Sequence, residues 1–164
     1  MIFNKPTKGS YDYNSLAITE DADGRQRVWA YAPNSATAKT PCAVSISPKT
    51  PFGYMAQLGS LSTATGAWFL VGVPEKTLAS GESGIFQIGG IASQTILASS
   101  ITGSAYVPLY WSSASGLVSL GASCSSSLYT RTASGYAGVF AAAQSAATTT
   151  HDIYLFGWPV QNNG

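Results

Sequence analysis

The sequence predicts an all-β protein, with a single antiparallel β-barrel or β-sandwich domain. Short apolar or alternating runs recur along the chain, and turn segments containing Gly separate them, as in other all-β domains. The 164 residues suit one domain, and the 45% of hydrophobic residues can form a core. Helical periodicity is weak, because Gly, Ser, Thr, Val and aromatic residues dominate. A barrel or a sandwich would also shield strand edges from aggregation.

Apolar or alternating patterns predict nine strands. They are Arg27–Tyr31, Ala43–Ile46, Ala67–Val73, Ile85–Ile88, Thr95–Ala98, Tyr106–Trp111, Leu117–Leu120, Leu128–Arg131 and Ile153–Trp158. The alanine-rich residues 139–147 fit either two helical turns or a strand rich in Ser and Ala, and both interpretations stay open.

A four-residue turn segment that ends in Gly occurs four times. Its copies are Thr63–Gly66, Leu78–Gly81, Ser113–Gly116 and Thr132–Gly135. Ser and Thr side chains bond to nearby backbone groups, and Gly accepts a positive φ, so each copy predicts a hairpin turn or a strand end. The irregular spacing of the copies argues against a solenoid or a propeller.

Charge is concentrated at the start of the chain. Eight of the fifteen charged residues lie within residues 1–27, whereas Arg131 is the only one between Ser83 and Thr150. We therefore divide the chain into a polar N-terminal segment, residues 1–27, and a barrel or sandwich domain, residues 28–164. The segment is expected to be an arm that orders against a neighbouring subunit or a larger assembly, or else a plain first strand and loop.

The low charge of the whole chain points to lasting contact with other proteins. Only 9% of the residues are charged, against about 25% in ordinary soluble domains. The 23 Ser and 15 Thr residues can cover the surface instead, and hydroxyl groups can be buried against a partner at lower cost than carboxylates.

Several partners and locations are not expected. The net charge of +1, without a run of Lys or Arg, argues against nucleic-acid binding. No apolar run approaches the roughly 20 residues that span a bilayer, so no membrane association is expected. The first residues lack a signal-peptide pattern, which predicts synthesis in a cytoplasm.

Catalytic, cofactor and metal sites are not expected either. The single imidazole, His151, enters a predicted strand beside Asp152, and neighbours on a strand point to opposite faces. Glu75 and Glu82 flank one predicted turn, with Lys76 as a neighbour of opposite charge, and are interpreted as loop-solvating residues. The chain is therefore interpreted as a non-enzyme.

The two cysteines and three of the glycines receive structural interpretations. Cys42 and Cys124 lie in no metal-binding or redox motif and are expected to be reduced, small and buried. Gly89–Gly90 and Gly138 fit no phosphate-binding pattern and are interpreted as turns or close backbone approaches.

Aromatic side chains are the candidate binding residues. They suit core packing or subunit interfaces, and exposed rings could also stack on sugars. The candidate interface residues are Phe3, Tyr11, Tyr13, Trp29, Tyr31, Trp111 and Trp158.

Residues 71–90, VGVPEKTLASGESGIFQIGG, resemble a segment of small capsid-associated proteins of tailed phages. In those proteins a Gly-Val pair comes first and a turn of small residues follows. The segment then ends with Gly, an aromatic residue and the pattern Gln-x-x-Gly. The order of strands from Val28 to Val160 agrees with this resemblance.

The resemblance implies a decoration, or cement, protein. Such a β-barrel module sits on the outer capsid surface of the virion at symmetry axes and bridges subunits of the major capsid protein, without catalytic residues. A closed oligomer, most simply a homotrimer, is expected. The alternative is a tail or fibre module that recognises host surface glycans through Tyr and Trp.

Overall fold

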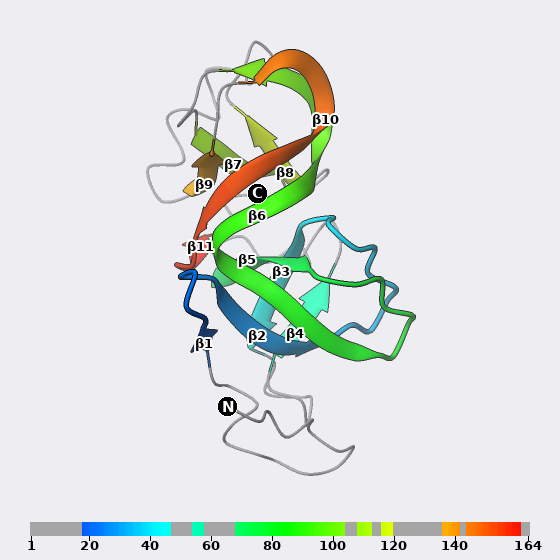
Figure 1. The fold of residues 1–164 in the computed structure, drawn as a ribbon. Coiled ribbons are helices and arrows are strands. Elements are labelled where there is room, and N and C mark those ends of the chain that lie inside the picture. The colour runs from blue at the N-terminus through cyan, green and yellow to red at the C-terminus, as the bar shows by residue number, and fades with distance from the viewer. Residues whose placement is uncertain are drawn as a thin grey trace.

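The computed structural model describes residues 18–46, 54–57, 68–103, 108–112, 116–119, 136–141 and 144–161. Within these ranges the chain forms strands and no helix, so the all-β prediction is confirmed (Figure 1). The strands are β1 (Thr19–Glu20), β2 (Gln26–Tyr31), β3 (Cys42–Ile46), β4 (Tyr54–Gln57), β5 (Trp68–Pro74), β6 (Ser83–Gly103), β7 (Pro108–Ser112), β8 (Gly116–Ser119), β9 (Tyr136–Phe140), β10 (Gln144–Phe156) and β11 (Val160–Gln161).

Most predicted strands in these ranges are present, but two boundaries differ. The predicted strands at 85–88 and 95–98 are parts of the single 21-residue strand β6. Strand β10 begins at Gln144 instead of Ile153, so the expectation that His151 enters a strand is wrong: it lies within one. The predicted strand at 128–131 lies outside the described residues.

The alanine-rich segment contains no helix where it is described: it consists of strand residues and a bend at Ala141. Val139 and Phe140 end β9, and Gln144 begins β10, so the helical interpretation does not hold for these residues. Pairing of β10 with both β6 and β9 explains this outcome, because tertiary strand pairing outweighs the helix propensity of a few alanines.

Two of the four turn segments can be checked. Leu78–Gly81 lies between the paired strands β5 and β6, and Gly81 has the expected positive φ, 85°. Ser112 pairs with Gly116, so β7 and β8 form an antiparallel pair around the third turn segment, of which residues 113–115 lie outside the described residues. The segments at 63–66 and 132–135 lie outside the described residues.

Five strands of the N-terminal half form a ring of pairings. The order is β2, β4, β3, β5, β6, and β6 pairs again with β2. Strand β4 lies parallel to β2, a departure from the expected antiparallel arrangement. It arises because the chain reverses twice, into β3 and again into β4, before it returns beside β2.

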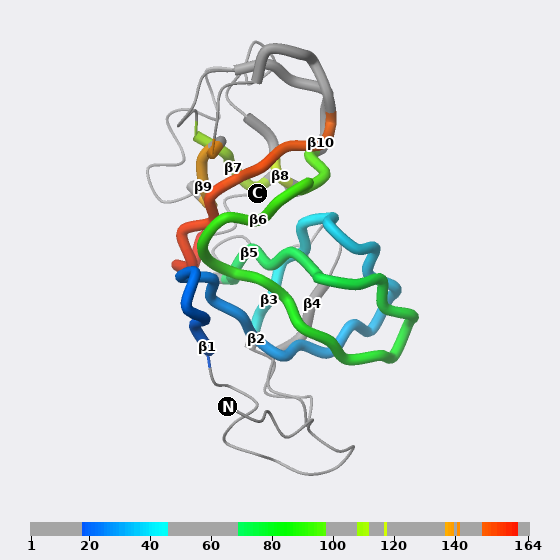
Figure 2. Tube along the Cα trace, in the orientation of Figure 1, coloured from blue at the N-terminus to red at the C-terminus, as the bar shows by residue number. Residues whose placement is uncertain are grey.

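The sheet continues beyond this ring and does not close as one barrel. The second half of β6 pairs with β10, which is followed by β9, β7 and the edge strand β8. Strands β6 and β10 run side by side and curve through the half that contains β7, β8 and β9 (Figures 1 and 2).

Two hydrophobic cores fill the two halves. The N-terminal core consists of Val28, Ala30, Ala32, Ala36, Cys42, Val44, Leu70, Leu78, Phe86 and Ile88. The C-terminal core consists of Ala43, Phe69, Val71, Val73, Ala92, Leu97, Leu109, Leu117, Ala137, Ile153, Leu155 and Val160.

Strand β5 contributes to both cores. Phe69, Val71 and Val73 belong to the C-terminal core, whereas Leu70 belongs to the N-terminal core. Gly72 also faces the N-terminal core, where a Cβ atom would lie 2.7 Å from Val44 Cγ2. Period-two alternation explains this division, and the continuous apolar sequence of β5 is the pattern of a strand buried on both faces.

Strand β6 passes from one half to the other at Gly89 and Gly90. Gly90 has a φ of 78°, and a Cβ there would lie 2.8 Å from the carbonyl oxygen of Gly24. The buried side chain of Gln87 donates hydrogen bonds to the carbonyl oxygens of Gly89, at 3.0 Å, and Ile91, at 2.8 Å. The expected close backbone approach is therefore confirmed, and Gln87 satisfies the carbonyl groups beside it.

A second close approach joins β9 to β10 at Gly138. A Cβ at this position would lie 2.2 Å from the backbone oxygen of Tyr154. Backbone atoms of a paired strand cannot move aside as a flexible side chain can. The glycine at 138 is thus a condition of the β9–β10 pairing.

We predict that Gly138→Ala destabilises the protein by about 3 kcal/mol, because the added methyl group overlaps this backbone. Gly81→Ala is the control, since its Cβ would meet only the Tyr31 hydroxyl at 4.0 Å and would incur mainly the cost of a positive φ, about 1 kcal/mol. Urea denaturation measures both. Equal losses would contradict the steric explanation.

Candidate functional site

The C-terminal end of β10 carries alternate buried and exposed side chains. Ile153 and Leu155 are buried in the C-terminal core, whereas Tyr154 is 45% exposed and Phe156 is half-buried on the opposite face. Trp158 follows after Gly157 and is 52% exposed. The strand thus places aromatic side chains at every second position on its outer face.

Strand β6 extends this apolar surface sideways. Ile91 is directly opposite Tyr154 in the β6–β10 register and is 52% exposed. Directly paired residues project to the same face of a sheet. We call the set Ile91, Tyr154, Phe156 and Trp158 the aromatic strip, and it contains three of the five large, exposed hydrophobic residues in the described part of the chain.

The rings of the aromatic strip pack on one another. Phe156 and Trp158 have ring centroids 4.3 Å apart and planes inclined by 31°. Tyr154 and Phe156 meet edge to face, with centroids 6.1 Å apart and planes inclined by 63°. The three rings therefore form a ridge of differently oriented planes.

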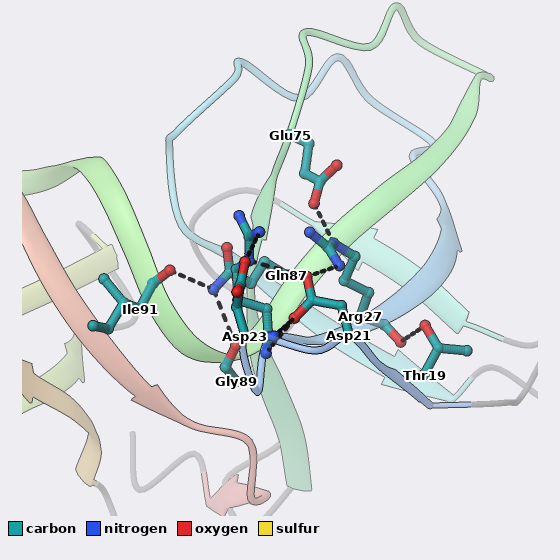
Figure 3. A network of polar contacts seen from close by, with 9 residues as sticks. Thr19, Asp21, Asp23, Arg27, Glu75, Gln87, Gly89 and Ile91 are labelled. Atoms are coloured by element: carbon teal, nitrogen blue, oxygen red, sulfur yellow. Dashed lines mark hydrogen bonds and ion pairs between the residues drawn. The ribbon is translucent and has the colours of Figure 1, made fainter.

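A network of ion pairs joins residues 21–27 to Glu75 (Figure 3). Asp21 Oδ2 accepts hydrogen bonds from Arg25 Nε at 3.0 Å and from Arg27 Nη1 at 2.7 Å. Arg25 Nη2 also bonds to Asp23 Oδ2 at 2.7 Å, and Arg27 Nε bonds to Glu75. The network thus ties the turn before β2 to the loop after β5.

Backbone contacts place this network next to the strip. Gly90 precedes Ile91 and lies against the turn. A Cβ atom added to Gly90 would meet the carbonyl oxygen of Gly24 and the Cα atom of Arg25. Gly157 separates Phe156 from Trp158 in the sequence. The Oε1 atom of Gln26 occupies the space where a Cβ of residue 157 would lie. The turn from Asp21 to Arg25 therefore lies at the border of the strip.

Hydrogen bonds depress the pKa of Asp21. Its Oδ1 accepts from the backbone N–H of Arg25 at 2.9 Å and from that of Asp23 at 3.0 Å. The bond from Arg25 N–H, followed by that from the Arg27 side chain, lowers the pKa of Asp21 from 3.8 to about 2. The bond to Glu75 in turn raises the pKa of Arg27.

The seven candidate interface residues have different surroundings. Trp158 belongs to the aromatic strip. Trp111 is half-buried and packs against the C-terminal core, edge-on to Phe69 with ring centroids 5.3 Å apart. Tyr31 and Trp29 are half-buried on β2, and the buried indole N–H of Trp29 has no hydrogen-bond partner among the described residues. Phe3, Tyr11 and Tyr13 lie outside the described residues.

The other members of the strip were not among the candidates. The signal for Tyr154 and Phe156 was present, because residues 153–156 alternate between aliphatic and aromatic side chains. Ile91 carried no such signal, since only the strand register places it beside Tyr154.

The residues considered for catalysis are separated or already engaged. His151 is buried opposite Thr95, whereas the adjacent Asp152 is partly exposed and accepts a hydrogen bond from the Gln94 backbone at 2.9 Å. Glu82 accepts a bond from the Ala79 N–H at 2.8 Å within its loop, and Glu75 forms an ion pair with Arg27.

Cys42 is a free cysteine in the N-terminal core, as expected. Burial raises the pKa of its thiol to about 12. Cys124 lies outside the described residues. In the described ranges no three His, Cys, Asp or Glu side chains gather as metal ligands would, and no helix has the length and apolarity to cross a membrane.

The chain matches no protein-family model, and comparisons with curated proteins and with solved structures found no similar protein.

We predict that Asp21 stabilises the fold above pH 4 and that this contribution is lost as the pH falls toward 2. A carboxyl group with a folded pKa of about 2 and an ordinary value of 3.8 binds its proton more weakly in the folded state, so acid favours unfolding. Thermal denaturation of the wild type and Asp21→Asn should therefore differ most above pH 4 and converge near pH 2. Asp23→Asn, which loses only the bond to Arg25, is the control. A constant difference across this range would contradict the prediction.

We also predict that iodoacetamide modifies Cys42 only when the protein unfolds, because the thiolate is the reactive form. In a Cys124→Ser variant, mass spectrometry should find little modification of the native protein and full modification in urea. Modification of the native protein at the rate of a free thiol would contradict the buried position.

Proposed function

We propose that this chain is a structural protein of a tailed-phage virion, a decoration protein that binds the outer capsid and bridges subunits of the major capsid protein. The observation that carries the proposal is the aromatic strip on the outer face of β10. Contiguous exposed apolar surface on a folded domain marks a site that another molecule covers. Aromatic residues are also the ones that contribute most to protein interfaces.

The distribution of charge supports a permanent protein contact. Among the described residues, five charged side chains form the Asp21 network. Strand β6 carries no charged residue, and the one carboxylate of β10 is Asp152, which bonds to the Gln94 backbone; the pair of Thr150 with Ile96 is uncharged. Few ionic groups would lose water when such a surface is covered. The resemblance of residues 71–90 to capsid-associated proteins supplies the identity of the partner, the major capsid protein.

The alternative is a tail or fibre module that recognises host surface glycans. The exposure of Trp158, 52%, favours it. The ridge of rings argues for a protein partner instead, because Phe156 covers one side of Trp158 and the inclined planes offer no flat platform for consecutive sugars. Binding of bacterial surface polysaccharide, abolished by Trp158→Ala, would support the glycan module.

We predict that the purified protein adds to capsids assembled without it and raises their resistance to heat and dilution. Tyr154→Ser with Trp158→Ser should weaken this addition about 30-fold, the loss expected when interface residues worth about 2 kcal/mol are removed. Light scattering during heating measures the reinforcement, and co-sedimentation measures binding.

Ile18→Ser is the matched control, because Ile18 is 49% exposed but lies directly before β1, outside the strip. Circular dichroism checks that each variant is folded. A folded wild-type protein that neither binds nor reinforces the capsid would overturn the proposal.

A further inference from the structure

The charged residues beside the aromatic strip indicate which charge a segment bound to the strip should carry. Within the described ion-pair network and Glu20, which accepts a bond from Gln26, four carboxylates stand against the two guanidinium groups of Arg25 and Arg27, so this network has an excess of negative charge. Asp23 has 72% of its side chain exposed, and Glu20 is also exposed. The complementary occupant is an apolar, aromatic segment that carries Lys or Arg.

Residues 1–17 of this chain have that chemistry. They include Phe3, Tyr11 and Tyr13, together with Lys5 and Lys8, and their only acidic residue is Asp12. A second copy of the aromatic strip would fit less well, because two acidic borders would then approach each other. Complementarity of charge therefore favours the N-terminal segment as the occupant.

The direction of β1 favours a segment from a neighbouring copy. Glu20 pairs with Gln26, which lies beside Gly157 at the strip, whereas Thr19 pairs with Arg27, one position farther away. The N-terminal end of β1 is therefore the end farther from the strip of its own copy. Seventeen extended residues reach as far as about 56 Å, which is enough to cross to an adjacent subunit.

We propose that residues 1–17 of one copy dock on the aromatic strip of the next, with Lys5 and Lys8 toward the acidic border. The contact is head to tail, and three such contacts related by a threefold axis close a homotrimer. The inference rests on the proposed function, because it identifies how copies of a decoration protein would hold one another before they bridge capsid subunits.

Sedimentation velocity of the full chain tests the assembly. The wild type should associate, whereas deletion of residues 1–17 or the pair Lys5→Glu and Lys8→Glu should weaken association at least tenfold. Lys76→Glu is the matched control, because Lys76 is exposed on the loop between β5 and β6. Adding Glu20→Lys and Asp23→Lys to the Lys5/Lys8 variant should restore association, which a merely misfolded variant would not show.

Disulfide trapping tests which copy supplies the segment. In a Cys124→Ser background, one population carries Phe3→Cys and the other Tyr154→Cys. Oxidation of the mixture should yield disulfide-linked dimers, and a chain that carries both substitutions should link to its neighbours. A disulfide within one chain, or no disulfide, would overturn the proposal, as would association that is unchanged without residues 1–17.

The two proposals can fail separately. A chain that binds and reinforces capsids but associates equally well without residues 1–17 would remove the arm and leave the decoration function. A chain that forms the trapped oligomer but ignores capsids would remove the decoration function and leave the arm.

Discussion

Burial of β5 on both faces is the constraint on which the rest of the structure depends. Leu70 packs in the N-terminal core while Phe69, Val71 and Val73 pack in the C-terminal core. Strand β3 has the same double role, since Val44 and Ala43 belong to different cores. A wall that is shared in this way couples the two halves, because neither core can lose it without exposing apolar surface of the other. The passage of β6 between the halves at Gly89 and Gly90 is the second physical link between them.

This arrangement also explains how an apolar surface is left uncovered. Strands β6 and β10 pair along their length and use their inner faces to close the C-terminal core, so Ile153 and Leu155 are buried. On the outer side of the same pair, Tyr154 is 45% exposed and the following Trp158 is 52% exposed. Successive residues of a strand point to opposite faces of the sheet. When the core covers one face, every second residue is available to a partner on the other face. The aromatic strip is therefore a direct consequence of the fold. The proposed assembly role follows because exposed apolar surface of this kind is a site that another molecule covers.

The ion-pair network gives one end of the strip its electrostatic character. Arg27 bonds to Asp21 and to Glu75, which is 48 positions away in the sequence, so the network joins the start of β2 to the end of β5. Its carboxylates outnumber its guanidinium groups, and the surplus lies on exposed side chains. A partner that covers the strip must therefore satisfy both apolar contact and negative charge, a combination that gives an interface its register and specificity.

The sequence by itself determined most of the longer described strands, the two-residue alternation within them and the turn that ends at Gly81, because these follow from local backbone sterics and from the period of a strand. It also indicated Cys42 as a buried thiol, and it gave Trp158 as a candidate interface residue, whose side chain the structure leaves exposed. Only the tertiary structure decided that two predicted strands are one, that Trp111 packs on the core and that Ile91 lies beside Tyr154. Alternation specifies which residues share a face, but which face another part of the chain covers depends on strand order and register, and these are set by contacts between residues far apart in sequence.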